Sequence, residues 1–323
     1  SGKHQGKNNN RGQALAAYRA QCNKPERVKS GICKAHAELV EKGFMVKFES
    51  LSNVQKQVIN NAEFTHYYPW SSVLKDSIST PVRLVVDPSR SGLNLILAKG
   101  ENNMARILEV LLRNRCKEYI FTSDISKLYN QLHLNDAALP YSLFMFSEDL
   151  DPDKPPDIYV LVRAWYGVRS TGNQSGAALD NLAEMMEQDF KHGAKVIQND
   201  RYVDDLLSGS NDEKIREEQI TQTREILRKG GFKLKFIAKS GENPPPEASS
   251  DGESLKILGY KWSPKVDSLG LGFEEINFSK RQRGAKKPNP FPVVTEDDVT
   301  KILDTVKLSR RMVVSKMAEF FDP

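Results

Sequence analysis

The sequence predicts an α+β fold, because helical and strand-like segments are mixed without the regular strand–helix–strand alternation of a parallel sheet. Apolar stripes with helical spacing indicate the helices. Short runs of β-branched and aromatic residues, ending at turn-forming residues, indicate the strands. At 323 residues, the chain is long enough for two or three packed units or one large divided domain.

The elements are predicted in order along the chain. Residues 1–12 are polar and rich in Gly, Asn and Lys, which predicts a disordered tail. Residues 13–60 have an interrupted helical spacing, which predicts a helical N-terminal extension. Strands are predicted at 80–87, 119–124, 141–146, 158–166 and 255–262, with a hairpin around 197–208. Helices are predicted after Asn102-Asn103, at 175–191, at 213–229, and in two C-terminal segments that begin at Thr295 and Ser309.

The composition is that of a soluble globular protein, with 39% hydrophobic and 28% charged residues. No apolar run approaches the roughly 20 residues needed to cross a bilayer, so we expect no membrane partner. The net charge of +5 suits a polyanionic partner but is too small to establish one. The chain begins with a serine and without a signal-peptide pattern, which favours a piece of a longer, processed polyprotein.

The three cysteines predict a reduced, intracellular setting, because they do not pair and form no C-x-x-C motif. Cys22, Cys33 and His36 are candidate zinc ligands, but a fourth ligand is missing. Partly buried helix residues are therefore the better interpretation of these three positions.

Two adjacent carboxylates carry the first functional signal, in the segment Tyr202-Val203-Asp204-Asp205. In a tight hairpin turn, the two like charges repel unless a divalent cation neutralises them. Hard oxygen ligands with open coordination positions suit magnesium. The alternative is a solvated turn that happens to contain two aspartates.

Asp124 supplies a third carboxylate, because it ends a predicted strand and can face the hairpin. Three carboxylates can hold two magnesium ions roughly 4 Å apart, which activate a hydroxyl and steady a leaving pyrophosphate. The alternative role for Asp124 is a helix N-cap. Tyr129 follows five residues later. If the Tyr129 ring lies below the sugar of an incoming nucleotide, it would clash with a ribose 2′-hydroxyl and admit only deoxyribose. The alternative role of Tyr129 is packing in the protein core.

Segments of the chain resemble, in order, the motifs of reverse transcriptases of LTR retrotransposons and retroviruses, most closely those of the BEL/Pao group. The segments are His66-Tyr67-Tyr68-Pro69 with Arg83-Leu84-Val85-Val86-Asp87, Phe121 to Gln131, Trp165-Tyr166-Gly167-Val168 with Ser170-Thr171, Tyr202 to Gly209, Gly230-Gly231-Phe232 with Lys233, Lys235 and Lys239, Leu258-Gly259-Tyr260 with Trp262, and Ser309 to Pro323. One departure is Gly172, which stands where the family normally has proline.

The resemblance implies roles for particular residues. Asp124, Asp204 and Asp205 would be the catalytic and metal-binding carboxylates, with Ile125 also at the metal site. The nucleotide-binding residues would be Arg83, Lys75, Tyr129, Tyr166 and Gly167, and the primer grip Leu258, Gly259 and Tyr260. A guanidinium suits a triphosphate because it forms paired hydrogen bonds. A lysine among Lys233, Lys235 and Lys239 would protonate pyrophosphate.

The resemblance also implies the fold and the partners. It implies a right-hand polymerase fold, with fingers and palm at 61–263, an antiparallel palm sheet backed by helices, and a linker and partial thumb at 264–323. The expected activity is RNA-directed DNA polymerisation with two Mg²⁺ ions, Mn²⁺ being the alternative ion. The expected partners are dNTPs and an RNA or DNA template with its primer. Protease, RNase H and integrase domains would lie outside this chain, and the setting would be the cytoplasm, a virus-like particle or the nucleus.

Two rival functions remain open. One is a catalytically inactive or domesticated relative that binds nucleic acid, which Gly172 favours and the three aspartates, Arg83 and Tyr129 disfavour. The other is an RNA-dependent RNA polymerase, which Tyr129 disfavours because ribonucleotides need room for the 2′-hydroxyl. The basic residues within 280–287 suit template phosphates, a nuclear-import signal or a solvated linker equally.

Overall fold

The computed structural model describes residues 10–74, 81–100, 106–249 and 251–271. The chain divides into two compact units, which are described separately. The first unit comprises Ser1–Met104, Ile125–Asp204 and Glu218–Leu234. The second comprises Ala105–Asp124, Asp205–Glu217 and Lys235–Pro323. The structure is a mixed α/β fold with antiparallel sheets, as the sequence predicts.

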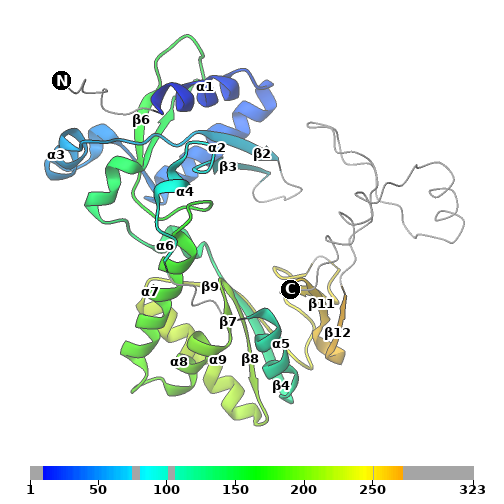
Figure 1. The fold of residues 1–323 in the computed structure, drawn as a ribbon. Coiled ribbons are helices and arrows are strands. Elements are labelled where there is room, and N and C mark those ends of the chain that lie inside the picture. The colour runs from blue at the N-terminus through cyan, green and yellow to red at the C-terminus, as the bar shows by residue number, and fades with distance from the viewer. Residues whose placement is uncertain (1–9, 75–80, 101–105, 250, 272–323) are drawn as a thin grey trace, which may run out of the picture. The chain divides into compact units, whose positions relative to one another are not determined.

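The first unit contains most of the helices of the described residues (Figure 1). Its helices are α1 (Arg11–Cys22), α2 (Glu26–Glu41), α3 (Asn53–Asn61), α4 (Leu93–Ile96), α6 (Leu128–Gln131), α7 (Thr171–Met186), α8 (Lys191–Asn199) and most of α9 (Glu213–Lys229). Its strands are β1 (Met45–Lys47), β2 (Trp70–Leu74), β3 (Val82–Val86), β5 (Leu143–Phe146), β6 (Asp157–Leu161) and β7 (Arg201–Tyr202). Strand β6 lies between β1 and β5 in one antiparallel sheet, and β2 pairs with β3 in another.

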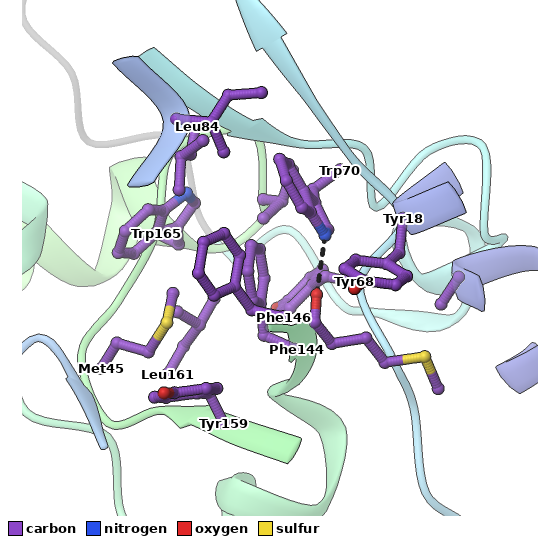
Figure 2. Packing of buried hydrophobic residues seen from close by; sticks show 14 of the residues in the cluster. Tyr18, Met45, Tyr68, Trp70, Leu84, Phe144, Phe146, Tyr159, Leu161 and Trp165 are labelled. Atoms are coloured by element: carbon purple, nitrogen blue, oxygen red, sulfur yellow. Dashed lines mark hydrogen bonds between the residues drawn. The ribbon is translucent and has the colours of Figure 1, made fainter. Parts of the chain in front are cut away.

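An aromatic core joins α1, α2 and α4 to the strands β1, β2, β3, β5 and β6 (Figure 2). Its largest fully buried side chains include Trp70, Phe144 and Phe146, which lie ring against ring. The Trp70 indole nitrogen donates a hydrogen bond of 3.0 Å to the Met145 carbonyl oxygen. This bond satisfies the one polar atom of the indole, so the ring can be buried at little cost.

The N-terminal segment contributes to this same core. Tyr18, Ile32 and Met45 are fully buried in it, and β1 pairs along the edge of β6. We expected residues 10–12 in a disordered tail. Instead, Asn10 directly precedes α1, and Arg11 and Gly12 are the first residues of this helix. The segment predicted as a separate helical extension is therefore packed together with β2, β3, β5 and β6.

The second unit is built on antiparallel strands. Its elements are α5 (Ile107–Arg115), β4 (Tyr119–Ile125), β8 (Asp205–Ser210), β9 (Leu234–Lys239), β10 (Leu255–Ile257), β11 (Tyr260–Ser263) and β12 (Ser268–Leu271). The four-stranded sheet has the order β7-β8-β4-β9, with β4 and β8 antiparallel. The last three strands form a meander, in which β10 pairs with β11 and β11 pairs with β12.

Several predicted boundaries change. The predicted strand at 255–262 is a hairpin, in which Leu258 and Gly259 form the turn between β10 and β11. The predicted hairpin at 197–208 starts later, because α8 continues to Asn199. The predicted strand at 158–166 ends at Leu161 as β6. The proposed caps Asn102-Asn103 and the C-terminal helices at Thr295 and Ser309 lie outside the described residues.

His36 is a buried titratable group in the first unit. Its ring is 3% exposed and stacks on Phe146 at a centroid distance of 3.6 Å, with the edge of Tyr159 at 4.5 Å. Cys33 donates its thiol hydrogen to the Glu148 carbonyl oxygen. These packing roles support the interpretation of Cys33 and His36 as partly or fully buried helix residues.

Burial lowers the pKa of His36 from 6.5 to about 4. The unfolded chain therefore binds more protons between these two pH values, so stability is full above pH 6.5 and falls as the pH drops toward 4. A shift of this size corresponds to about 3 kcal/mol. Urea unfolding at pH 4.5 and pH 7 should show a smaller difference for His36→Phe than for the unsubstituted protein. His192→Gln is the control, because this imidazole is partly exposed, and an unchanged difference in His36→Phe would contradict the prediction.

Candidate active site

Asp124 and Asp205 face each other across the β4–β8 ladder. Residues directly opposite in an antiparallel pair project from the same face of the sheet. The backbone nitrogen of Ile125 donates to the Asp204 carbonyl oxygen at 2.8 Å. This hydrogen bond lies beside the Asp124–Asp205 pair and does not join the two residues, so they form a non-hydrogen-bonded pair. In an antiparallel sheet, opposed side chains lie closest in pairs of this kind. The sheet register therefore holds the two carboxylates side by side.

The Asp124–Asp205 pair places two carboxylates directly opposite each other in the sheet. Asp124 and Asp205 are both half-buried, and like charges directly opposite on two strands destabilise a sheet. Ile120, Phe121 and Leu206 are buried and fix the strands beneath the pair, so the strands cannot easily separate to relieve the repulsion. A cation placed at the pair would remove the cost. Asp124 lies within β4, so the alternative role as a helix N-cap is wrong.

Asp204 lies in the two-residue turn between β7 and β8, next to Val203. Val203 has a φ of 57°, in the left-handed region that a β-branched residue seldom adopts. Such strain costs on the order of 1–3 kcal/mol and is concentrated at functional sites. The predicted tight turn is present; it contains Asp204, whereas Asp205 is the first residue of β8.

Tyr129 lies on the single-turn helix α6 in the first unit. Burial raises the pKa of Tyr129 above its usual range, and the nearby charges of Asp204 and Tyr202 raise it further. The hydroxyl therefore stays protonated at neutral pH. The effect of the Asp204 charge indicates that Tyr129 lies within electrostatic range of this aspartate; its role in sugar selection stays a prediction.

Lys127 fixes the start of α6. It has a φ of 50°, and its ammonium nitrogen lies 2.8 Å from the Glu38 carboxylate of α2. The ammonium also lies 5.8 Å from the centroid of the Phe44 ring. The N-terminal segment therefore holds the loop that carries Tyr129. This positioning pair was missed from the sequence, because Glu38 and Lys127 are 89 residues apart and no local pattern links them.

Tyr166 and Gly167 lie in the loop before α7. The Tyr166 ring is 44% exposed and contacts the Tyr129 ring at a centroid distance of 4.7 Å. Gly167 has a φ of 91°, which favours glycine. A Cβ on Gly172, in the first turn of α7, would lie 3.8 Å from the Tyr129 hydroxyl oxygen, which is ordinary contact. Gly172, which departs from the family's proline, therefore lies near the Tyr129 hydroxyl.

The other predicted nucleotide-binding residues are only partly located. Arg83 is exposed on β3, opposite Val73 of β2. Lys75 lies outside the described residues. Among the candidate lysines, Lys239 donates to the Glu217 carboxylate at 2.9 Å.

The predicted primer-grip residues lie in the second unit. Leu258 and Gly259 have φ values of 48° and 92°, which define a tight hairpin turn, and Tyr260 begins β11. Leu258 is 9% exposed although it lies in a turn. The expected strand at these positions is thus replaced by a rigid turn.

The predicted magnesium site stays a prediction. Carboxylate oxygens at Asp124, Asp204 and Asp205 are the donors that magnesium prefers. In the part of the chain that the structure describes, no group of three or more His, Cys, Asp or Glu side chains is arranged to hold a metal ion. The Ile125 side chain is fully buried and apolar, so only its backbone carbonyl could serve as a ligand.

A comparison with solved structures relates this arrangement to a known fold. The chain is similar to the native crystal structure of prototype foamy virus protease-reverse transcriptase, with a TM-score of 0.50 and 17% sequence identity. The fold resembles that of a retroviral reverse transcriptase. The match covers 79% of this chain and 28% of the foamy virus chain, so the chain spans little more than a quarter of that protein's length.

The other comparisons give no relative. No protein-family model matches the sequence, and no curated protein matches it. Within the described residues, no helix is long and apolar enough to cross a membrane.

Proposed function

We propose that the chain is an RNA-directed DNA polymerase domain, a piece of the polyprotein of an LTR-type retrotransposon of the BEL/Pao group. The observation that carries the proposal is the Asp124–Asp205 pair, held in register across β4 and β8, with Asp204 directly before Asp205 in a turn whose other residue, Val203, has a left-handed φ. The similarity of fold to a retroviral reverse transcriptase supports it. The fingers, palm and thumb arrangement belongs to the same proposal.

Asp124, Asp204 and Asp205 would hold two magnesium ions, with manganese as the alternative. The ions supply Lewis-acid activation of the primer 3′-hydroxyl and charge neutralisation on the leaving pyrophosphate. The strand register holds Asp124 and Asp205 close before any ion arrives, so little reorganisation is needed. The Tyr129 ring would exclude the 2′-hydroxyl of an incoming ribonucleotide. Arg83 and Lys75 would bind the triphosphate of a dNTP.

The proposed setting follows from this activity. The chain would bind an RNA or DNA template with its primer through phosphate contacts, without reading base sequence. Leu258, Gly259 and Tyr260 would contact the primer. Protease, RNase H and integrase domains would lie elsewhere in the same polyprotein. The site of action would be intracellular, in the cytoplasm, a virus-like particle or the nucleus.

Primer extension on an RNA template with magnesium tests the proposal. The chain should incorporate dNTPs, and Asp204→Asn should lose at least about 100-fold of the rate, because each 1.36 kcal/mol of lost transition-state stabilisation is tenfold. Asp189→Asn, at an exposed carboxylate on the same unit, is the matched control and should extend normally. Equal extension by Asp204→Asn and Asp189→Asn would refute the two-metal proposal.

The second candidate is a catalytically inactive nucleic-acid-binding module. It is favoured by the absence, within the described residues, of an assembled three-ligand group. Binding of a fluorescent template–primer with no extension, in both the unsubstituted chain and Asp189→Asn, would support this module instead.

A further inference from the structure

We infer that Tyr166 determines sugar specificity indirectly, by holding the Tyr129 ring in place. The inference rests on the proposed polymerase function and adds a positioning residue to it. Tyr166 lies in the loop before α7 and Tyr129 on α6, and both belong to the first unit. Their ring centroids are 4.7 Å apart, with an interplanar angle of 53°. This distance lies within the range at which aromatic pairs attract each other.

The backbones that carry the two rings are joined to each other. The Ala164 nitrogen donates to the Leu132 carbonyl oxygen at 2.9 Å, and the buried Asn130 amide donates to the Ala164 carbonyl oxygen at 3.2 Å. Leu128, beside Tyr129 in the sequence, is 1% exposed. The main chain at Tyr129 is therefore fixed. The Tyr129 ring can move only by rotation about its side-chain torsion angles.

The Tyr166 loop bears on those torsions. The Tyr166 ring lies against the Tyr129 ring. Gly172 bounds the hydroxyl end, where a Cβ would be 3.8 Å from the hydroxyl oxygen. Gly172 has no side chain to hold the ring laterally, whereas the Tyr166 ring lies against it. Gly167, directly after Tyr166, has a φ of 91°, so this loop has a defined turn rather than an extended path.

Removal of the Tyr166 ring would leave an open space beside Tyr129. Tyr129 could then turn away from the position at which it meets the 2′-carbon of an incoming nucleotide. Discrimination against ribonucleotides would weaken, although Tyr129 itself is present. A nucleotide contact by Tyr166 alone would instead alter the binding of dNTPs and rNTPs equally.

The test measures the ratio of kcat/KM for a dNTP to that for the matching rNTP. The variants are Tyr166→Ala, Tyr166→Phe, Tyr129→Ala and the double variant with alanine at both positions. Tyr166→Ala should lower the ratio about 2- to 10-fold, which is the range expected for loss of one aromatic pair. Tyr166→Phe should retain the ratio, because it keeps the ring. The double variant should discriminate no worse than Tyr129→Ala, because both act through one ring.

Tyr141→Ala is the matched control. Tyr141 is also a partly exposed tyrosine in an aromatic pair, with the Phe64 ring at 6.0 Å. Its removal should leave the ratio unchanged. An unchanged ratio in Tyr166→Ala, or a fall in the double variant equal to the product of the two single effects, would overturn the inference.

A second measurement separates this inference from the proposed function. Fluorotyrosine placed at position 129 reports its surroundings by ¹⁹F NMR without any reaction. Tyr166→Ala should shift and broaden this signal, and Tyr166→Phe should largely restore it. A chain that shows no extension refutes the proposed function and the claim of specificity. An unperturbed ¹⁹F signal in Tyr166→Ala refutes the positioning role, whether or not the chain extends primers.

Discussion

Asp124→Asn is expected to abolish primer extension while leaving the protein at least as stable. The substitution removes one of two carboxylates that face each other across β4 and β8. Loss of a metal ligand should reduce extension by about 1000-fold, since metal stabilisation of a transition state contributes several kcal/mol. Relief of the like-charge pair should raise the free energy of unfolding in metal-free buffer by up to about 1 kcal/mol.

Urea unfolding at pH 7, with EDTA or with magnesium, measures the second effect. Magnesium should stabilise the unsubstituted chain, because a ligand that binds only the folded state shifts the folding equilibrium. It should not stabilise Asp124→Asn. Asp189→Asn should behave as the unsubstituted chain in both buffers. Equal stabilisation of Asp124→Asn by magnesium would place the ion elsewhere.

Gly209→Ala is expected to be the most destabilising single methyl addition in the ladder that carries the carboxylates. Gly209 lies on β8 opposite Ile120. A Cβ there would be 2.4 Å from the Tyr119 carbonyl oxygen and 2.9 Å from the Ile120 Cα, both backbone atoms. Backbone atoms cannot rotate aside, so the strands must move apart. We expect a loss of about 3 kcal/mol, at the upper end of the range for overpacking.

Gly270→Ala is the matched control for this experiment. Gly270 also lies in a strand, β12, and a Cβ there would meet its nearest atom, the Lys261 carbonyl oxygen, only at 4.0 Å. Urea unfolding should show a small change for Gly270→Ala and a large one for Gly209→Ala. Equal stabilities of the two variants would show that β4 and β8 can separate without cost.

Local patterns predicted the elements whose signals are strong and self-contained. The helix predicted at 213–229 has the bounds of α9, because its polar face is continuous and Gly230-Gly231 follows. The strand predicted at 119–124 is β4 with one further residue, Ile125. The turn at Leu258 was missed, because an apolar residue in a left-handed conformation gives no turn signal in the sequence.

The candidate site shows the same division between local and distant information. The aspartate turn and the opposed strand were predicted from short motifs, and the register of Asp124 with Asp205 agrees with them. The contact between Tyr129 and Tyr166 was not predicted, nor was the ion pair between Glu38 and Lys127. Contacts of this kind depend on how distant segments pack, and a single sequence contains no period or spacing that encodes them.

The position of β4 between β8 and β9 has a consequence for synthesis on the ribosome. Thr122 and its hydrogen-bond partner Leu206 are 84 residues apart, and Ser123 and its partner Phe236 are 113 residues apart. The strand that carries Asp124 therefore emerges long before either neighbour exists, and Ile120 and Phe121 have no sheet to enter. Because β4 pairs with its neighbours late, folding is slow. Until then, the apolar, unpaired strand is exposed and can associate with other nascent chains. Nascent chains that end before β8 should therefore depend on chaperones more than those that extend past β9.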